Sequence, residues 1–182
     1  MTDTLIQLDN DSVATIDQLI AFEGDDLEQL CEVTIGAIKE GAGFNWLVPP
    51  AMSSLEAYWK GVLLIPDRRL YVVRLNGRIA GAFQLVRPPS HNEAGAFRIE
   101  VMTFFLGIWA RGQGLSFKMM EKAEQEARLM GCRSLDVNMR ANNMAAVAVC
   151  ERQGFVRWGE KARYAFIGDE FIPGYYYAKD LD

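Results

Sequence analysis

One segment of this sequence has residue types and spacing that could bind a ligand directly: the glycine-rich hexapeptide Arg111-Gly112-Gln113-Gly114-Leu115-Ser116. It follows an apolar run and precedes residues with helical spacing, so it predicts a strand-to-helix turn. The start of a helix presents unpaired backbone N–H groups and a positive dipole end, which suit a phosphate or pyrophosphate. The two glycines would let a ligand approach the backbone, and the arginine adds a positive charge. On this pattern alone, a pyrophosphate site and a tight turn without a ligand both remain open.

A carboxylate inside an apolar strand is the second feature with chemical potential. Glu100 interrupts the apolar run 97–106. An ionisable group there is costly unless it is solvated, paired or functional. One interpretation is a general base, and the alternative is a salt bridge with Arg98 on the same face. Because side chains alternate along a strand, that face is also expected to carry Met102, Phe104 and Leu106.

A second carboxylate, Asp136, lies in the predicted strand 133–139. Alternation places it with Ser134 and Asn138, opposite the apolar residues of the strand. It could take part in proton transfer, and a water shared with Glu100 would connect the two acids. An ordinary solvated strand face is the alternative.

The elements that must position these residues follow from periodicity and turn signals. Apolar residues at helical spacing predict four helices, at 25–40, 53–61, 112–130 and 142–152, the second capped by Ser53. Apolar runs between turn residues predict six strands, at 70–75, 78–86, 97–106, 133–139, 155–167 and 171–179. Asn76-Gly77 between two apolar runs predicts a hairpin. We therefore expect a single α+β domain over residues 1–182, with a mainly antiparallel sheet and a central strand-helix-strand unit.

Two motifs in this order resemble the GNAT superfamily of acetyl-CoA-dependent N-acyltransferases. The family pattern R/Q-x-x-G-x-G/A matches RGQGLS, with Ser116 where the family has Gly or Ala. The pattern N-x-x-A-x-x-x-Y-x-x-x-G-F matches Asn143 to Phe155, except at Cys150. The resemblance covers Glu100 to Phe155. It implies the GNAT fold, a mixed, mostly antiparallel sheet of six to seven strands with helices on both faces.

A weaker resemblance links the flanking regions to antibiotic- and toxin-detoxifying members, such as the tabtoxin-resistance acetyltransferases. It rests on the turn Gly41-Ala42-Gly43, the strand Arg98 to Val101, and the ending Asp169 to Leu181. This similarity also implies an acid at Asp136.

The family resemblance implies acetyl-CoA as co-substrate and direct transfer of the acetyl group to an amine. It implies that the backbone of Phe104, Phe105 and Leu106 hydrogen-bonds the pantetheine arm. The pyrophosphate would lie on Arg111 to Ser116, and Asn143 would contact the cofactor arm from the other side. Glu100 lies where other members carry a catalytic glutamate, which suits an amine that must lose a proton before it attacks.

Cys150 is where this sequence departs from the family, since the usual residue there is a tyrosine that protonates the departing sulfur. Three interpretations remain open. The first is that Cys150 is a small core residue, and the second is that it donates a proton through a water. The third is that it takes the acyl group covalently, which a neighbouring histidine would normally assist. Tyr164 or a residue of 175–177 could replace the missing phenol.

The resemblance places the acceptor pocket between the first two helices and the closing hairpin. Its candidate walls are Phe44, Trp46, Tyr58, Trp59, Trp158 and Tyr164. An aromatic pocket with a carboxylate at its floor predicts a small primary amine as acceptor. A catalytically weak acyl-CoA-binding domain and a protein N-acetyltransferase are the alternative hypotheses.

Composition excludes several other functions. A net charge of -5 disfavours nucleic acid as a partner. Three cysteines at wide spacing suit reduced thiols, and one histidine without paired ligand motifs predicts no metal site. No apolar stretch approaches the length of a membrane span, and the first residues lack a secretory pattern. We expect a soluble, cytoplasmic protein without membrane partners, and a homodimer is compatible with this reading.

Overall fold

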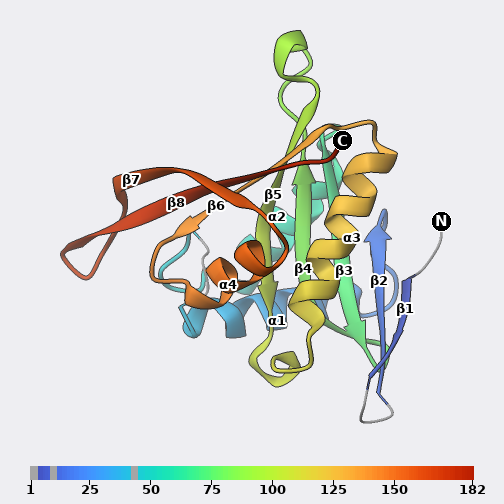
Figure 1. Ribbon diagram of the computed structural model, residues 1–182. Coiled ribbons are helices and arrows are strands. Elements are labelled where there is room, and N and C mark those ends of the chain that lie inside the picture. The colour runs from blue at the N-terminus through green and yellow to red at the C-terminus, as the bar shows by residue number, and fades with distance from the viewer. Residues whose placement is uncertain (1–3, 9–11, 42–44) are drawn as a thin grey trace.

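The computed structural model describes residues 4–8, 12–41 and 45–182. Its strands form one twisted sheet in the order β1-β2-β3-β4-β5-β6-β8-β7 (Figure 1). Only the pairing of β5 with β6 is parallel among those described. The strands are β1 Thr4–Gln7, β2 Val13–Leu19, β3 Arg68–Leu75, β4 Arg78–Val86, β5 Arg98–Leu106, β6 Ser134–Arg140, β7 Val156–Ile167 and β8 Glu170–Asp180.

The α+β class is confirmed, but the described sheet has eight strands and not six or seven. The two additional strands, β1 and β2, precede the first predicted element. β1 is only four residues long, and β2 carries Asp17 and Gln18 inside its apolar pattern. These features obscure the alternation of apolar and polar residues on which a strand prediction depends.

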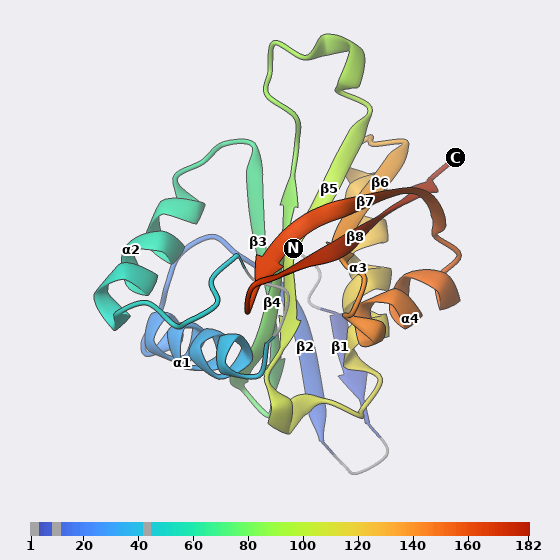
Figure 2. The same cartoon turned by 90° about the vertical axis from the view of Figure 1, so that its left-hand side faces the viewer.

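The helices cover both faces of the sheet, as Figure 2 shows. Helices α1 (Asp26–Lys39) and α2 (Met52–Leu63) lie on one face, and α3 (Leu115–Leu129) and α4 (Met144–Arg152) lie on the other. The starts of α2, α3 and α4 differ from the prediction, and α4 begins at Met144 and not at Asn142. Helix α2 begins at Met52, with Ala51 and not Ser53 as its N-cap. Helix α3 begins at Leu115 and not at Gly112, because Gly112 and Gly114 have φ of 78° and 74°, outside the helical region.

Two hydrophobic clusters, one on each face, hold the sheet to its helices. On the α1/α2 face, Trp59 and Leu30 are fully buried. On the α3/α4 face, the rings of Tyr71 and Phe83 stack with centroids 4.8 Å apart. Burying each such side chain contributes about 2 kcal/mol. No helix in the described part of the chain has the length and apolar character needed to cross a membrane.

A bulge in β5 decides which side chains face the site. The pairing of β4 with β5 shifts between Ala82 and Gln84, and Thr103 on β5 has a φ of 51°. The extra residue reverses the alternation, as bulges do. Ile99, Val101 and Leu106 therefore belong to the α3/α4 cluster, whereas Phe105 belongs to the α1/α2 cluster. The prediction that Phe104 and Leu106 share the face of Glu100 is wrong.

The parallel strands β5 and β6 separate beyond their first residues. Their pairing runs from Arg98 with Ser134 to Val101 with Val137. Past that point the two strands diverge, which Figure 1 shows below the β5 and β6 labels. The end of β5 and the end of β6 thus flank an opening in the sheet, and the site lies there.

Candidate active site

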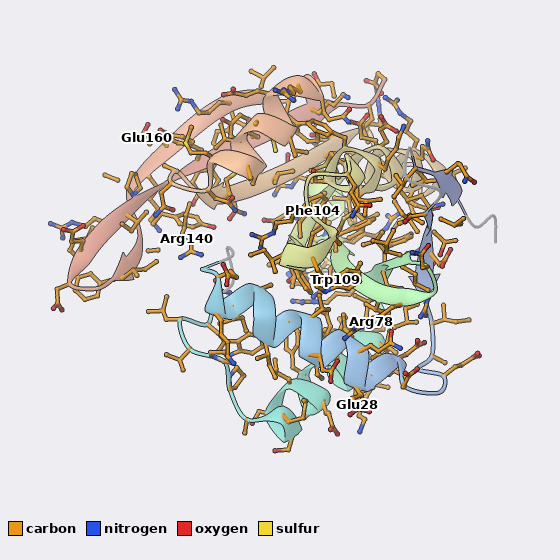
Figure 3. The ribbon with its side chains drawn as sticks, turned by 90° about the horizontal axis from the view of Figure 1, so that it is seen from below. Glu28, Arg78, Phe104, Trp109, Arg140 and Glu160 are labelled. Carbon is orange, nitrogen blue, oxygen red and sulfur yellow. The ribbon has the colours of Figure 1, made fainter. Side chains whose placement is uncertain are left out.

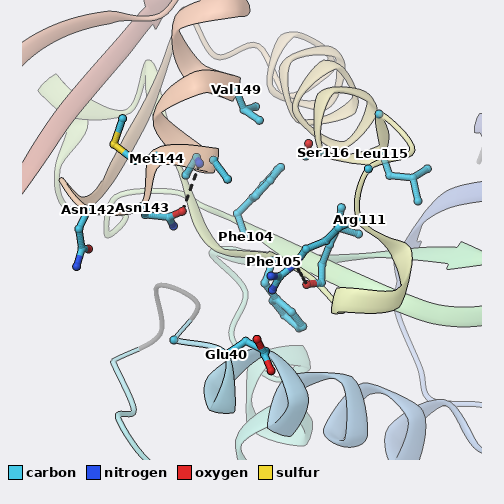
Figure 4. Close-up of a pocket in the computed structure, with 16 residues that line it drawn as sticks. Glu40, Phe104, Phe105, Arg111, Leu115, Ser116, Asn142, Asn143, Met144 and Val149 are labelled. Atoms are coloured by element: carbon cyan, nitrogen blue, oxygen red, sulfur yellow. Dashed lines mark hydrogen bonds between the residues drawn. The ribbon is translucent and has the colours of Figure 1, made fainter.

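The first cavity at this opening has a volume of about 420 Å³ (Figure 4). It lies between the end of α1, the end of β5, the start of α3 and the start of α4. It is lined by every residue predicted to bind the cofactor except Gln113: Phe104, Phe105, Leu106, Arg111, Gly112, Gly114, Leu115, Ser116 and Asn143. In the described part of the chain, the Gln113 side-chain oxygen is buried without a hydrogen-bond partner.

The loop between β5 and α3 presents backbone to this cavity. Gly114 is the N-cap of α3 in a left-handed conformation, and no side chain caps the helix in the described structure. The Phe117 N–H donates to the Gly114 carbonyl, so the N–H groups of Leu115 and Ser116 are the ones left for a ligand, and the helix dipole adds positive potential. Arg111 Nε donates to the Leu106 carbonyl at 3.2 Å, which fixes the arginine at the rim of the cavity. This arrangement suits an anionic group such as a pyrophosphate.

The opposite wall begins at Asn143, the N-cap of α4. Its side-chain oxygen accepts the backbone N–H of Ala146 at 3.3 Å, which is drawn in Figure 4. Asn143 therefore has a structural role that its motif position alone did not reveal, and its amide nitrogen keeps its donors for a ligand.

Arg140 ties the two sides of the opening together. It ends β6, and its Nη2 donates to the Gly41 carbonyl at 2.8 Å, just past the end of α1. Figure 3 shows Arg140 near this end of α1. This contact connects β6 to the residues that directly follow α1. Two of these residues, Glu40 and Gly41, line the first cavity.

A second cavity of about 300 Å³ adjoins the first. The two cavities share Phe104, Asn143, Ala146 and Val149. Figure 4 shows Phe104 directed toward Val149, with Phe105 directed toward α1. The second cavity also contains Glu100, Asn138, Cys150, Trp46, Tyr58 and Tyr164. A ligand spanning both cavities would pass Phe104 and end near the Glu100 carboxylate.

Glu100 lies half-buried in this cavity and is held by its neighbour on β6. Asn138 Nδ2 donates to Glu100 Oε1, and the Tyr164 hydroxyl donates to Asn138 Oδ1. Within the described residues no ion pair joins Glu100 to Arg98, so the salt-bridge alternative is wrong. Burial, and then the charge of Asp136, raise the pKa of Glu100, against the opposing effects of the Asn138 bond, Arg98 and Arg68.

Asp136 is paired in register with Glu100 across β5 and β6. Burial raises its pKa, while Arg98 and the hydroxyl of Ser134 oppose the shift. Asp136 lines a third cavity of about 470 Å³, and Glu100 and Asn138 line both this cavity and the second one. The structure thus brings the two predicted acids together.

Cys150 is almost fully buried and packs in the α3/α4 cluster, where it also touches the second cavity. Burial, and then the nearby Glu151, raise the pKa of its thiol to about 12. A thiol with this pKa is neither a ready proton donor nor a thiolate nucleophile at neutral pH.

The predicted aromatic walls that the structure describes divide into three groups. Trp46, Tyr58 and Tyr164 line the second cavity. Trp59 is fully buried in the α1/α2 cluster, so its placement in the acceptor pocket is wrong. Trp158 lines the third cavity beside Tyr176, with ring centroids 5.4 Å apart. Phe44 lies outside the described residues.

The roles of two polar residues of the site were not predicted from the sequence. Alternation placed Asn138 on the strand face of Asp136, but its hydrogen bond to Glu100 was not predicted. Gln84 is fully buried and donates to the Tyr58 hydroxyl at 3.0 Å, while it accepts from Arg68 at 3.0 Å. Its strand is otherwise apolar, and that contrast was the available signal. Among the described residues, no group of three or more His, Cys, Asp or Glu side chains could hold a metal ion.

The chain resembles known acetyltransferases in both sequence and fold. It is 41% identical over 138 residues to an uncharacterized N-acetyltransferase in the hisH-hisA intergenic region of Azospirillum brasilense, which covers 76% of this chain and 82% of the relative. The fold matches an N-acetyltransferase from Staphylococcus aureus Mu50 with a TM-score of 0.79 and 20% identity, over 93% of this chain and 99% of that one. It also matches yncA from Salmonella typhimurium, assigned as an acetyltransferase and solved with its cofactor acetyl-CoA, with a TM-score of 0.75 and 17% identity, over 93% of this chain and 94% of that one.

The family model described as the acetyltransferase (GNAT) family matches residues 39–155, which include the glycine-rich loop, Glu100 and the start of α4. The fold, the cavity at the loop and the sequence relative agree with that match, and they support acetyl-CoA as the co-substrate. The chain belongs to the GNAT family of acetyltransferases.

Proposed function

We propose that this N-acetyltransferase acetylates the primary amine of a small molecule that occupies the second cavity. The observation that carries this proposal is the shape and lining of that cavity. It measures about 300 Å³, has aromatic walls at Trp46, Tyr58 and Tyr164, and holds the carboxylate of Glu100. A volume of this size suits a small ligand, and the carboxylate suits an ammonium group.

The first cavity would hold acetyl-CoA through main-chain groups more than through side chains. The N–H groups at the start of α3, together with Arg111, would bind the pyrophosphate. The end of β5, from Phe104 to Leu106, lies beyond the pairing with β6, faces the same cavity and would offer backbone groups to the pantetheine amides. The amide nitrogen of Asn143 would donate from the opposite wall.

Acetyl-CoA supplies a thioester carbonyl, and Glu100 would take the proton that the ammonium group must lose. The raised pKa of Glu100 makes it a stronger base than an ordinary glutamate. A nitrogen–carbon bond then forms and the carbon–sulfur bond breaks. The nitrogen loses a second proton when it becomes an amide. The coenzyme A thiolate takes up one proton, so the step balances. Cys150 would serve packing in this scheme, because its thiol pKa is about 12.

The test is the release of free coenzyme A with two panels of acceptors, small primary amines and peptides with free N-termini or lysines. We expect turnover with a member of the first panel and little with the second. Turnover with peptides alone would overturn the small-molecule proposal. Tight binding of acetyl-CoA by calorimetry, without turnover in either panel, would instead indicate a domain that binds acyl-CoA without catalysis.

A further inference from the structure

An irregularity in the closing hairpin carries Tyr164 into the second cavity. The pairing of β7 with β8 shifts register twice, and the larger shift lies between Lys161, which pairs with Gly174, and Ala165, which pairs with Ile172. Three residues of β7, 162–164, therefore lie opposite a single residue of β8. A bulge of this kind bends a strand and redirects a side chain. Here the redirected side chain is Tyr164, which lines the second cavity.

Gly174 makes room for the tyrosine ring. A Cβ atom built on Gly174 would lie 2.1 Å from Cγ and 2.3 Å from Cδ2 of Tyr164. The ring therefore rests directly on the backbone of β8. A glycine inside a strand often marks such a close approach, and no other residue would leave the ring in this position.

In this position the Tyr164 hydroxyl is linked to Glu100 through one side chain, that of Asn138. It donates to Asn138 Oδ1, and Asn138 Nδ2 donates to Glu100 Oε1. Because a side-chain amide has one acceptor end and one donor end, a donor at its oxygen holds its nitrogen toward the carboxylate. We propose that Tyr164, seated by the bulge and by Gly174, is a positioning residue that acts through Asn138 to orient and stabilise the Glu100 carboxylate. This inference rests on the proposed role of Glu100 as the base.

The charged and titratable groups around this chain of contacts come from four strands. Asp136 on β6 raises the pKa of Glu100, and Arg98 on β5 and Arg68 on β3 lower it. Tyr164 faces Glu100 itself, Tyr176 on β8 and Arg140 on β6. The Asn138 bond favours the ionised form of Glu100. Loss of this bond should therefore raise the pKa of Glu100, because burial and Asp136 are then less opposed.

The first test compares Tyr164→Phe and Gly174→Ala with the wild-type enzyme in a pH–rate profile. Tyr164→Phe removes the hydroxyl, and Gly174→Ala displaces the ring. Both should lower kcat/KM at neutral pH by roughly three- to tenfold and move its acid limb to higher pH. Gly159→Ala is the matched control, because a Cβ there would lie 3.6 Å from Tyr176 Cβ, an ordinary contact in the same hairpin. A wild-type acid limb in Tyr164→Phe would overturn the proposal.

A double-variant comparison separates positioning from a direct role. If Tyr164 acts through Asn138, Tyr164→Phe should have no further effect on the acid limb in an Asn138→Ala background. Additive effects of the two changes would overturn the route through Asn138. Calorimetric binding of acetyl-CoA should be unchanged in both single variants, because neither Tyr164 nor Asn138 lines the first cavity. Thermal unfolding monitors whether Gly174→Ala is folded.

A third measurement needs no acceptor at all. The Glu100 carboxyl can be titrated by ¹³C NMR in labelled protein, with its signal assigned by comparison with Glu100→Gln. Its pKa should be higher in Tyr164→Phe than in wild type, and an equal pKa would overturn the proposal. If the shift occurs but wild-type protein acetylates no amine, the contact chain stands and the proposed function fails.

Discussion

Glu100 and Asp136 are directly paired across the parallel strands β5 and β6, at the edge of the opening that leads to the active site. Burial raises the pKa of each carboxyl, and the charge of Asp136 further raises that of Glu100. Two carboxylates this close cannot both ionise without cost. The sheet register therefore adds to the effect of burial on the pKa of Glu100, and the Asn138 bond, Arg98 and Arg68 limit the shift.

Replacing Glu100 by glutamine should remove the proposed base while keeping the side chain's shape. We expect kcat/KM at neutral pH to fall by roughly 10² to 10³, and the deficit to shrink at high pH, where the amine is already neutral. The pH–rate profile is the measurement. Glu160→Gln, at an exposed position on β7, is the matched control. A profile identical to wild type would remove Glu100 from the mechanism.

Replacing Asp136 by asparagine should lower the pKa of Glu100, since it removes the nearby negative charge. The acid limb of kcat/KM should then move to lower pH, the direction opposite to that expected for Tyr164→Phe. The same pH–rate experiment distinguishes these two directions. A shift to higher pH would show that Asp136 stabilises the charged base by another route.

The raised pKa of Glu100 also predicts the pH dependence of stability. The folded state binds this proton more tightly than the unfolded state, whose glutamate titrates near 4.5. The free energy of unfolding should therefore fall as the pH rises from about 4.5 through the folded-state pKa. Glu100→Gln should flatten this part of the curve in urea titrations at several pH values. An unchanged slope would contradict the assigned burial of the charge.

Much of the fold and of the cofactor loop was predictable because the signals are local. Helical periodicity, the Asn76-Gly77 hairpin and the glycine-rich loop depend on neighbouring residues. The bulge at Thr103 is different. A β-branched residue with a φ of 51° is rare, and no local pattern announces it. The register of β4 against β5 imposes this conformation, so the face of Phe104 was assigned wrongly.

The contacts around Glu100 were unpredictable for a related reason. Tyr164, Asn138 and Glu100 come from three strands whose pairing is known only in the folded state. The sequence indicates this arrangement only in part: alternation places Asn138 beside Asp136, and Gly174 interrupts the bulky residues of β8. That glycine indicates a close approach but does not say which ring approaches.

Gly114→Ala should weaken acetyl-CoA binding by about tenfold or more, because alanine at a φ of 74° is strained and would shift the N–H groups at the start of α3. Gly131→Ala supplies the matched control. Gly131 follows the other end of α3 with a φ of 75° and, like Gly114, has open space for a Cβ. Both changes should cost about 1 kcal/mol of stability, and only Gly114→Ala should change the calorimetric Kd. Equal Kd values would contradict the role of the loop.

Cys150→Ala should leave the pH–rate profile of the enzyme unchanged, because a thiol with a pKa of about 12 does not titrate in the pH range of the assay. The native protein should also react slowly with thiol reagents at this residue, since Cys150 is only 1% exposed. A loss of buried volume should cost about 1 kcal/mol of stability. Loss of the basic limb of the profile would instead assign Cys150 to proton transfer.

Asp26 and Arg74 join α1 to β3 by an ion pair. Arg74 Nη1 donates to Asp26 Oδ1 at 2.7 Å and Nη2 to Oδ2 at 3.0 Å, in a bidentate pair. Asp26→Asn leaves the guanidinium only partly satisfied and should cost about 2–4 kcal/mol in urea unfolding. Glu56→Gln, in the exposed pair with Lys60, is the control and should cost less than about 0.5 kcal/mol.

The Asp26 pair also has a defined pH signature. Its bond to Arg74 lowers the pKa of Asp26 below the ordinary value of 3.8. Its contribution is therefore present above pH 3.8 and lost as the pH falls through the folded-state pKa. Because Glu40 and Gly41 at the other end of α1 line the first cavity, loosening this helix should also weaken acetyl-CoA binding. An Asp26→Asn variant with reduced stability but an unchanged Kd would contradict this link between the two ends of α1.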